Sequence, residues 1–223
     1  MKVTEIPFSS LGIKAEEVYS TMRYGGATPE PAIREIVDET LGAAASIARP
    51  KYICGRVPAR PLGSGTAEIG GTIFKVGGII ASYLEGMTEA CIFIATAGRE
   101  FSVWLSSLKK SGDILSEYVA DAVGSVIAEE CVKALERDLA AGINAPHSLP
   151  YSPGYCAWDI REQKRLFALF PDSEPCGVTL SESCLMSPEK SVSGFFAIGK
   201  DLVPQPYRCE VCTNRTCYKN RHK

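Results

Sequence analysis

A long amphipathic segment is the feature of this sequence that most constrains its fold. From Asp113 to Ala141 apolar residues return at helical spacing, and Gly142 supplies a C-terminal stop. The apolar stripe consists of Ile114, Tyr118, Val119, Ala122, Val126, Ile127, Cys131, Leu135 and Leu139. The pattern predicts one helix over these residues with a single buried face.

Shorter patterns predict the other elements. Thr28 and Pro29 are typical of an N-cap followed by a first helical residue, and Pro50 ends that helix. Further helices are predicted at 11–22, 76–84, 100–109 and 159–170. Apolar runs rich in β-formers predict strands at 51–57, 89–97, 177–180 and 192–198. The elements mix without a regular βαβ alternation, which favours an α+β fold.

Composition excludes several classes of protein. A formal charge of −2 provides no overall field for nucleic acid or acidic lipid. No run approaches the roughly 20 apolar residues of a membrane span. The N-terminal MKVTEIPFSS lacks the apolar core and cleavage site of a secretory signal. We therefore expect a cytoplasmic protein with neither nucleic acid nor membrane as a partner.

Two patterns suggest phosphate or histidine chemistry, and neither is convincing. The glycines of Gly63–Gly71 fit neither GxxxxGK[ST] nor GxGxxG, so we interpret the stretch as a flexible connection between strands. His147 and His222 are the only histidines, too few for a multi-histidine zinc site. His147 is interpreted as a loop residue.

Nine cysteines divide into groups with different interpretations. Cys54, Cys91 and Cys131 stand among apolar residues, as small core residues do. The C-terminal Cys209, Cys212 and Cys217 have CxxCx4C spacing, which can place three thiolates on one ion or cluster. The fourth ligand would come from Cys156, Cys176, Cys184, His222 or a partner. The motif predicts an iron–sulfur or zinc site, or else a solvated tail with reactive thiols.

Three segments carry the strongest functional signal. They are YSPGYCAWDIREQK at Tyr151–Lys164, ESCLM at Glu182–Met186 and SVSGFF at Ser191–Phe196. In the first, Pro153 restricts the backbone and Gly154 frees it, so a ligand can approach the main chain between aromatic faces. The other interpretation of this loop is a Pro-Gly turn with structural tyrosines.

Taken in this order, the three segments resemble the activation domain of cobalamin-dependent methionine synthase. The resemblance implies a single α+β domain of mixed helices and a mainly antiparallel, bent sheet over residues 1–203. Residues 204–223 form an added Cys-rich tail, which that family's activation domain does not carry. The resemblance implies a stand-alone accessory protein for reductive reactivation, by remethylation, of a corrinoid-dependent methyltransferase such as methionine synthase.

The resemblance also implies a binding site for S-adenosylmethionine. The residues implied to bind it are Ser152, Pro153, Gly154, Tyr155, Glu129, Ser191, Ser193, Phe195 and Phe196. Ser191 and Ser193 have a second interpretation, in which they only fix a tight turn before the last strand. Two family residues are replaced: an arginine aligns with Pro150 and a glutamate with Ser125, which implies weaker binding of S-adenosylmethionine.

No Asp-x-His-x-x-Gly segment is present, so the resemblance implies that the corrinoid belongs to a partner. A flavodoxin- or ferredoxin-like reductant is the other implied partner. The chain would position the methyl donor and supply no nucleophile, so no catalytic residue is predicted. The alternative is an electron-transfer partner of a corrinoid protein, in which the tail cluster delivers the electron and the S-adenosylmethionine pocket is vestigial.

Overall fold

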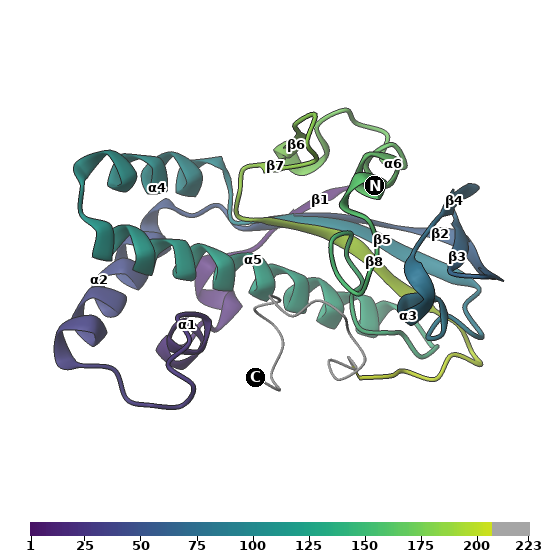
Figure 1. The fold of residues 1–223 in the computed structure, drawn as a ribbon, viewed down its shortest axis with the longest axis horizontal. Helices are drawn as coiled ribbons and strands as arrows, with labels where there is room; N and C mark the ends of the chain where they lie inside the picture. Colours follow the sequence, from purple (N-terminus) through teal and green to yellow (C-terminus); the bar gives the residue numbers. More distant parts are fainter. Residues whose placement is uncertain (207–223) are drawn as a thin grey trace.

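The structure, a computed structural model, describes residues 1–206 (Figure 1). Its α-helices are α1 (Ala15–Thr21), α2 (Pro31–Ile47), α3 (Gly77–Ala81), α4 (Arg99–Ser111), α5 (Ile114–Gly142) and α6 (Gln163–Phe167). Its strands are β1 (Val3–Glu5), β2 (Lys51–Gly63), β3 (Thr66–Ile69), β4 (Thr72–Phe74), β5 (Glu89–Thr96), β6 (Thr179–Leu180), β7 (Met186–Ser187) and β8 (Ser191–Ile198). Short 3₁₀ turns occur at η1 (Phe8–Leu11), η2 (Ile160–Glu162) and η3 (Pro175–Gly177).

An antiparallel sheet in the order β4-β3-β2-β5-β8 forms the middle layer, and β1 pairs with the start of β2. The predicted α+β class and antiparallel sheet are confirmed. Central strand β5 is buried along nearly its whole length, which explains its continuous apolar run.

Two apolar cores lie on opposite faces of this sheet. On one face α1, α2, α4 and α5 pack over the side chains of Cys91, Phe93 and Phe196. On the other face α3, α6 and the segment around Trp158 cover Ile92 and Phe195. In Figure 1 helix α5 runs below the strands and α6 lies above them.

The predicted long helix is confirmed as α5, and Asp113 caps it by accepting a hydrogen bond from the Ser116 amide at 3.1 Å. Its apolar stripe is buried except in the first turn. There Ile114 and Tyr118 are 79% and 50% exposed, so their assignment to the buried face was wrong. This turn extends beyond the strands that α5 covers (Figure 1).

Other boundaries differ from the predictions for local reasons. Helix α2 begins at Pro31 rather than Pro29, because Glu30 precedes a proline and adopts an extended ψ of 150°. The glycine-rich stretch is not one flexible connection: it contains β3 between two tight turns. Helix α6 ends at Phe167, three residues before its predicted end.

Within residues 1–206, no helix is both long and apolar enough to cross a bilayer. The same residues contain no group of three His, Cys, Asp or Glu side chains that could hold a metal ion. The predicted ligands Cys209, Cys212 and Cys217, like His222, lie outside the described residues.

Candidate ligand-binding site

The segment before the candidate loop runs along the free edge of β8. The Tyr151 amide donates to the Phe195 carbonyl oxygen at 2.9 Å, and the Phe195 amide donates back to Tyr151 at 2.9 Å. The Ser148 amide donates to the Ala197 carbonyl oxygen, and its hydroxyl accepts from the Ala197 amide, each at 2.9 Å. Two of the three motif segments are therefore held together by main-chain pairing.

Gly194 permits this close approach. A Cβ atom at this position would lie 2.2 Å from the Tyr151 carbonyl oxygen. Any larger residue would displace the segment that leads into the loop.

The loop itself, Ser152–Trp158, closes through its own backbone. The Gly154 amide donates to the Trp158 carbonyl oxygen at 2.8 Å, and the Trp158 amide donates to Tyr155 at 2.8 Å. Gly154 has φ +93°, and Cys156 and Ala157 also adopt left-handed conformations, with φ of 51° and 65°. Left-handed backbone at two consecutive non-glycine residues is uncommon, and such residues concentrate at functional sites.

Aromatic packing fixes both ends of the loop to the sheet. The Phe195 ring contacts the Tyr151 ring at a centroid distance of 5.7 Å and the Trp158 ring at 5.5 Å. Trp158 also meets Phe74 edge-to-face at 6.1 Å. Phe195 is fully buried, so its observed role is to anchor the two ends of the loop to the sheet.

The predicted loop residues differ in accessibility. Gly154 is exposed, Ser152 and Tyr155 are half-buried, and Pro153 is buried. Among the atoms of residues 1–206, a Cβ atom at Gly154 would meet only Ile160 Cδ1, at 3.3 Å. The Gly154 backbone is thus open to a ligand. Phe196 is fully buried on the opposite face of the sheet, against Phe93.

The serines of β8 are also enclosed. Ser191 Oγ donates to the Pro188 carbonyl oxygen at 2.7 Å and lies 2.9 Å from Thr96 Oγ1. These contacts are those expected of a residue that fixes the turn before β8. Ser193 is 2% exposed.

Two positions on α5 complete the predicted set. Glu129 is half-buried. Ser125 Oγ lies 3.0 Å from the ammonium of Lys190, which also pairs with Asp121 at 2.8 Å. The position that the resemblance assigns to a glutamate therefore lies beside a lysine, a contact that sequence alone did not indicate.

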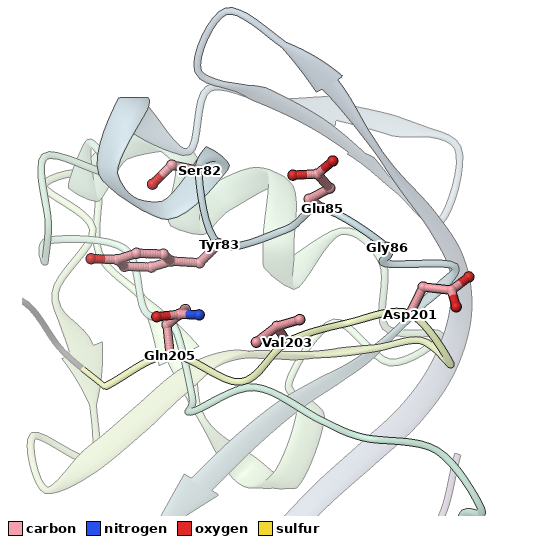
Figure 2. A pocket seen from close by; sticks show the side chains of 7 residues that line it. All are labelled: Ser82, Tyr83, Glu85, Gly86, Asp201, Val203 and Gln205. Carbon is pink, nitrogen blue, oxygen red and sulfur yellow. The ribbon is translucent and has the colours of Figure 1, made fainter.

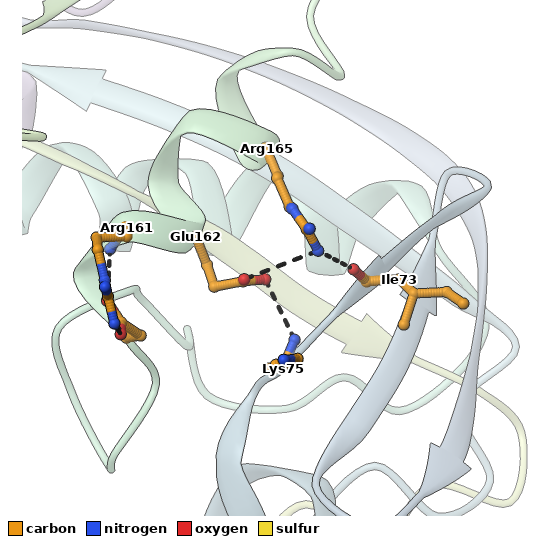
Figure 3. A network of polar contacts seen from close by, with 6 residues as sticks. Ile73, Lys75, Arg161, Glu162 and Arg165 are labelled. Atoms are coloured by element: carbon orange, nitrogen blue, oxygen red, sulfur yellow. Dashed lines mark hydrogen bonds and ion pairs between the residues drawn. The ribbon is translucent and has the colours of Figure 1, made fainter. Parts of the chain in front are cut away.

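A polar clamp joins the segment after the loop to the β3–β4 hairpin (Figure 3). Glu162 Oε2 accepts from the Lys75 amide at 3.2 Å, and Arg165 donates to the Ile73 carbonyl oxygen at 2.9 Å. The Arg165 guanidinium lies 3.8 Å from Glu162 Oε1. A Cβ atom at Gly77 would be 3.1 Å from the Ala157 carbonyl oxygen, so the start of α3 contacts the loop directly.

Sequence reasoning missed a pocket beside the loop. It has a volume of about 780 Å³ and lies between residues 82–86, after α3, and residues 201–205, after β8 (Figure 2). Its Tyr83 ring stacks on the Tyr151 ring at 6.4 Å with an interplanar angle of 22°. Residues more than a hundred positions apart in sequence line it, so no local pattern could have indicated it.

Local environment shifts two pKa values at the loop. Burial raises the pKa of the Tyr151 phenol, which therefore stays protonated at neutral pH. Hydrogen bonds from the Arg161 side chain and amide lower the pKa of Asp159 to about 2. The Asp159 carboxylate is thus charged and caps η2 by accepting from the Arg161 amide at 2.8 Å.

Comparison with known proteins identifies the family. A family model described as "Vitamin B12 dependent methionine synthase, activation domain" matches residues 79–202. The chain belongs to this family. The match begins within α3 and covers β5, α4, α5, the candidate loop and β8, whereas α1, α2 and β1–β4 precede it. The predicted resemblance to the activation domain is confirmed.

A solved structure has the same fold. It is described as the MetH reactivation domain bound to AdoHcy and superposes with a TM-score of 0.66 at 17% identity. The alignment covers 92% of this chain and 79% of that chain. No curated protein matches this activation-domain chain by sequence.

Proposed function

We propose that this activation-domain protein assists the reductive reactivation of a corrinoid-dependent methyltransferase and binds S-adenosylmethionine at the 152–158 loop. The corrinoid belongs to the partner, and a flavodoxin- or ferredoxin-like protein supplies the electron. Family membership over residues 79–202 supports the proposal, and so does the description of the similar structure as a reactivation domain bound to AdoHcy.

The observation that carries the proposal is the paired contact between Tyr151 and Phe195. It holds the loop on the edge of β8 and leaves the Gly154 backbone exposed, with half-buried Tyr155 next to it. An exposed glycine backbone beside an aromatic ring suits a flat ligand such as an adenosyl group.

The role of the chain in this function is positioning. When bound, S-adenosylmethionine supplies the methyl group, and the cobalt of the partner accepts it. Tyr155 and the Gly154 backbone would orient the donor, while Phe195 and Trp158 keep the loop in one conformation. Holding two reactants in line lowers the reaction barrier considerably, so the protein does not need to supply a nucleophile.

Ligand affinity is expected to be modest. Pro150 stands where the resemblance places an arginine, and loss of a bidentate arginine–carboxylate contact costs on the order of 100-fold in affinity. Lys190 beside Ser125 adds a positive charge near the position of the family glutamate. Half-buried Glu129, one turn further along α5, is our candidate for the acidic contact to the sulfonium.

Calorimetric titration with S-adenosylmethionine tests the proposal. Tyr155→Ala should weaken binding by roughly tenfold, the range of an aromatic stacking contact. The matched control is Tyr118→Ala, which removes a half-exposed tyrosine from the first turn of α5. Absence of heat at millimolar ligand with the unaltered chain would contradict S-adenosylmethionine binding.

A second function is favoured by one sequence observation, the CxxCx4C motif at Cys209, Cys212 and Cys217. In this alternative the tail binds an iron–sulfur cluster and passes an electron to the corrinoid protein. Elemental analysis and visible absorbance of anaerobically purified protein distinguish the two. Iron with sulfide would support electron transfer, whereas zinc or no metal would count against it.

A further inference from the structure

The pocket between residues 82–86 and 201–205 contains two acidic groups that have no role in the proposed function. We call this pocket the acidic groove. Glu85 and Asp201 on its rim are both exposed (Figure 2). In the part of the chain that the structure describes, neither carboxylate forms an ion pair with a lysine or arginine. The exposed Lys200 beside Asp201 offsets only part of their charge.

The groove also has an apolar part. Tyr83 lines it, and Val203 is 66% exposed there although it is a branched apolar residue. A groove with an apolar floor and carboxylates on its rim fits a peptide that carries both cationic and apolar side chains.

Residues 207–223, which we call the basic tail, have this composition. They contain five Lys or Arg residues against one Glu, together with Tyr207, Val211 and Tyr218. Gln205 lines the groove, and the basic tail begins two residues later. Cys209 is four positions after Gln205, which limits the distance between their Cα atoms to roughly 14 Å.

We propose that the basic tail docks in cis in the acidic groove, with its cationic side chains on Glu85 and Asp201. A segment tethered at the rim has a local concentration in the millimolar range, so weak contacts are enough to hold it. A free peptide of the same composition would need far stronger contacts to compete.

Docking has a consequence for the tail thiols. Tyr83, in the groove, stacks on Tyr151, which begins the candidate loop. A docked tail would therefore cover a groove whose Tyr83 contacts the start of this loop, and docking would shield the tail thiols from solvent. This inference does not depend on S-adenosylmethionine binding, and the test below uses no ligand.

Peptide-resolved alkylation of the full chain by iodoacetamide tests the proposal, with a chelator and a reductant present so that metal cannot protect the thiols. Glu85→Gln combined with Asp201→Asn should raise the alkylation rate of Cys209 about three- to tenfold, the size expected for two exposed ion pairs. High salt should raise the rate of the unaltered chain and have little effect on the variant.

The matched control is Asp38→Asn with Glu39→Gln, which removes two exposed carboxylates from α2. It should leave the Cys209 rate unchanged. Charge reversal gives a second test: Glu85→Lys should speed alkylation, and adding Arg208→Glu should restore protection. All the altered residues in the described part are exposed, so the variants should keep the fold. Buried Cys131 should remain unalkylated in every variant, which checks that the fold is intact.

Equal Cys209 rates in the unaltered chain and the double variant, at low and high salt, would overturn the proposal. Protection that grows with protein concentration would overturn it as well, because the groove would then bind the tail of a second copy.

Discussion

The ammonium of Lys190 lies 2.8 Å from the carboxylate of Asp121, but the two side chains differ greatly in exposure. Lys190 is 11% exposed and Asp121 is 50% exposed. The lysine also donates to Ser125 Oγ at 3.0 Å. This contact fixes the start of β8 to the middle of α5, next to the serines of the candidate site.

This asymmetry predicts which substitution costs more. Asp121→Ala leaves a nearly buried ammonium without its counter-ion and should lower the free energy of unfolding by about 2 kcal/mol. Lys190→Met leaves a half-solvated carboxylate and should cost about 1 kcal/mol. Urea denaturation measures the free energy of unfolding of both variants. The double variant should have the same free energy of unfolding as Lys190→Met alone. A larger loss for Lys190→Met than for Asp121→Ala would show that the packing of the lysine stem dominates.

Substitution of Gly194 tests how strongly the position of the loop depends on its pairing with the edge of β8. Because an added Cβ would overlap the Tyr151 carbonyl oxygen, Gly194→Ala should cost about 2 kcal/mol and weaken ligand binding. The matched control is Gly42→Ala in the exposed part of α2, where an added Cβ would meet no atom of the described residues within 4 Å. That substitution should stabilise the protein by roughly 0.5 kcal/mol, because alanine favours helix. Thermal unfolding of both variants checks the contrast.

The clamp of Glu162 and Arg165 should act locally. Arg165→Met removes the donor to the Ile73 carbonyl oxygen, so we expect severalfold faster amide exchange in the β3–β4 hairpin. The change in the free energy of unfolding should stay below about 1 kcal/mol, because Arg165 is exposed. Arg161→Met serves as control, since that guanidinium bonds to Asp159 within its own turn. Hairpin exchange that rises equally in both variants would contradict a specific clamp.

The fold was predictable where burial imposes a period on the sequence. Helix α5 and strand β5 are long and well packed. The apolar stripe of α5 and the continuous apolar run of β5 therefore match the residues that they bury. Some short strands at the periphery were not predicted. Strands β1 and β4 have three residues each and few buried positions, so they leave no periodic signal.

The candidate site shows a similar division. The loop was predictable because its Pro-Gly turn and the resemblance are both local in sequence. The anchoring of Tyr151 and Trp158 on Phe195, the contact of Lys190 with Ser125 and the acidic groove each join distant segments. These contacts depend on the topology of the fold; the pairing of residues 147–151 with β8, for example, brings Tyr151 to Phe195.

Asp159 gives a prediction on pH. Its carboxyl pKa falls from 3.8 to about 2, first because of the hydrogen bond from the Arg161 side chain. A depressed pKa in the folded state means that its contribution to stability is present above 3.8 and is lost as the pH falls toward 2. Carbon-detected NMR titration should locate this low pKa. Arg161→Gln should move the pKa back toward 3.8, and an unchanged value would assign the shift to the main-chain amide alone.

The cysteine thiols of residues 1–206 should differ strongly in their rates of alkylation. Burial raises the pKa of Cys131 to about 12 and that of Cys176 to about 11, so almost no thiolate forms at pH 8.5. The thiol of Cys54 has a lowered pKa because Cys91 donates a hydrogen bond to it, and Cys54 is only half-buried. Alkylation of the native protein, followed by mass spectrometry, should therefore modify Cys54 well before Cys131 and Cys176. In urea the three rates should converge, because unfolding removes the burial that separates them. Equally fast modification of Cys131 and Cys54 in the native state would show that the core opens around α5.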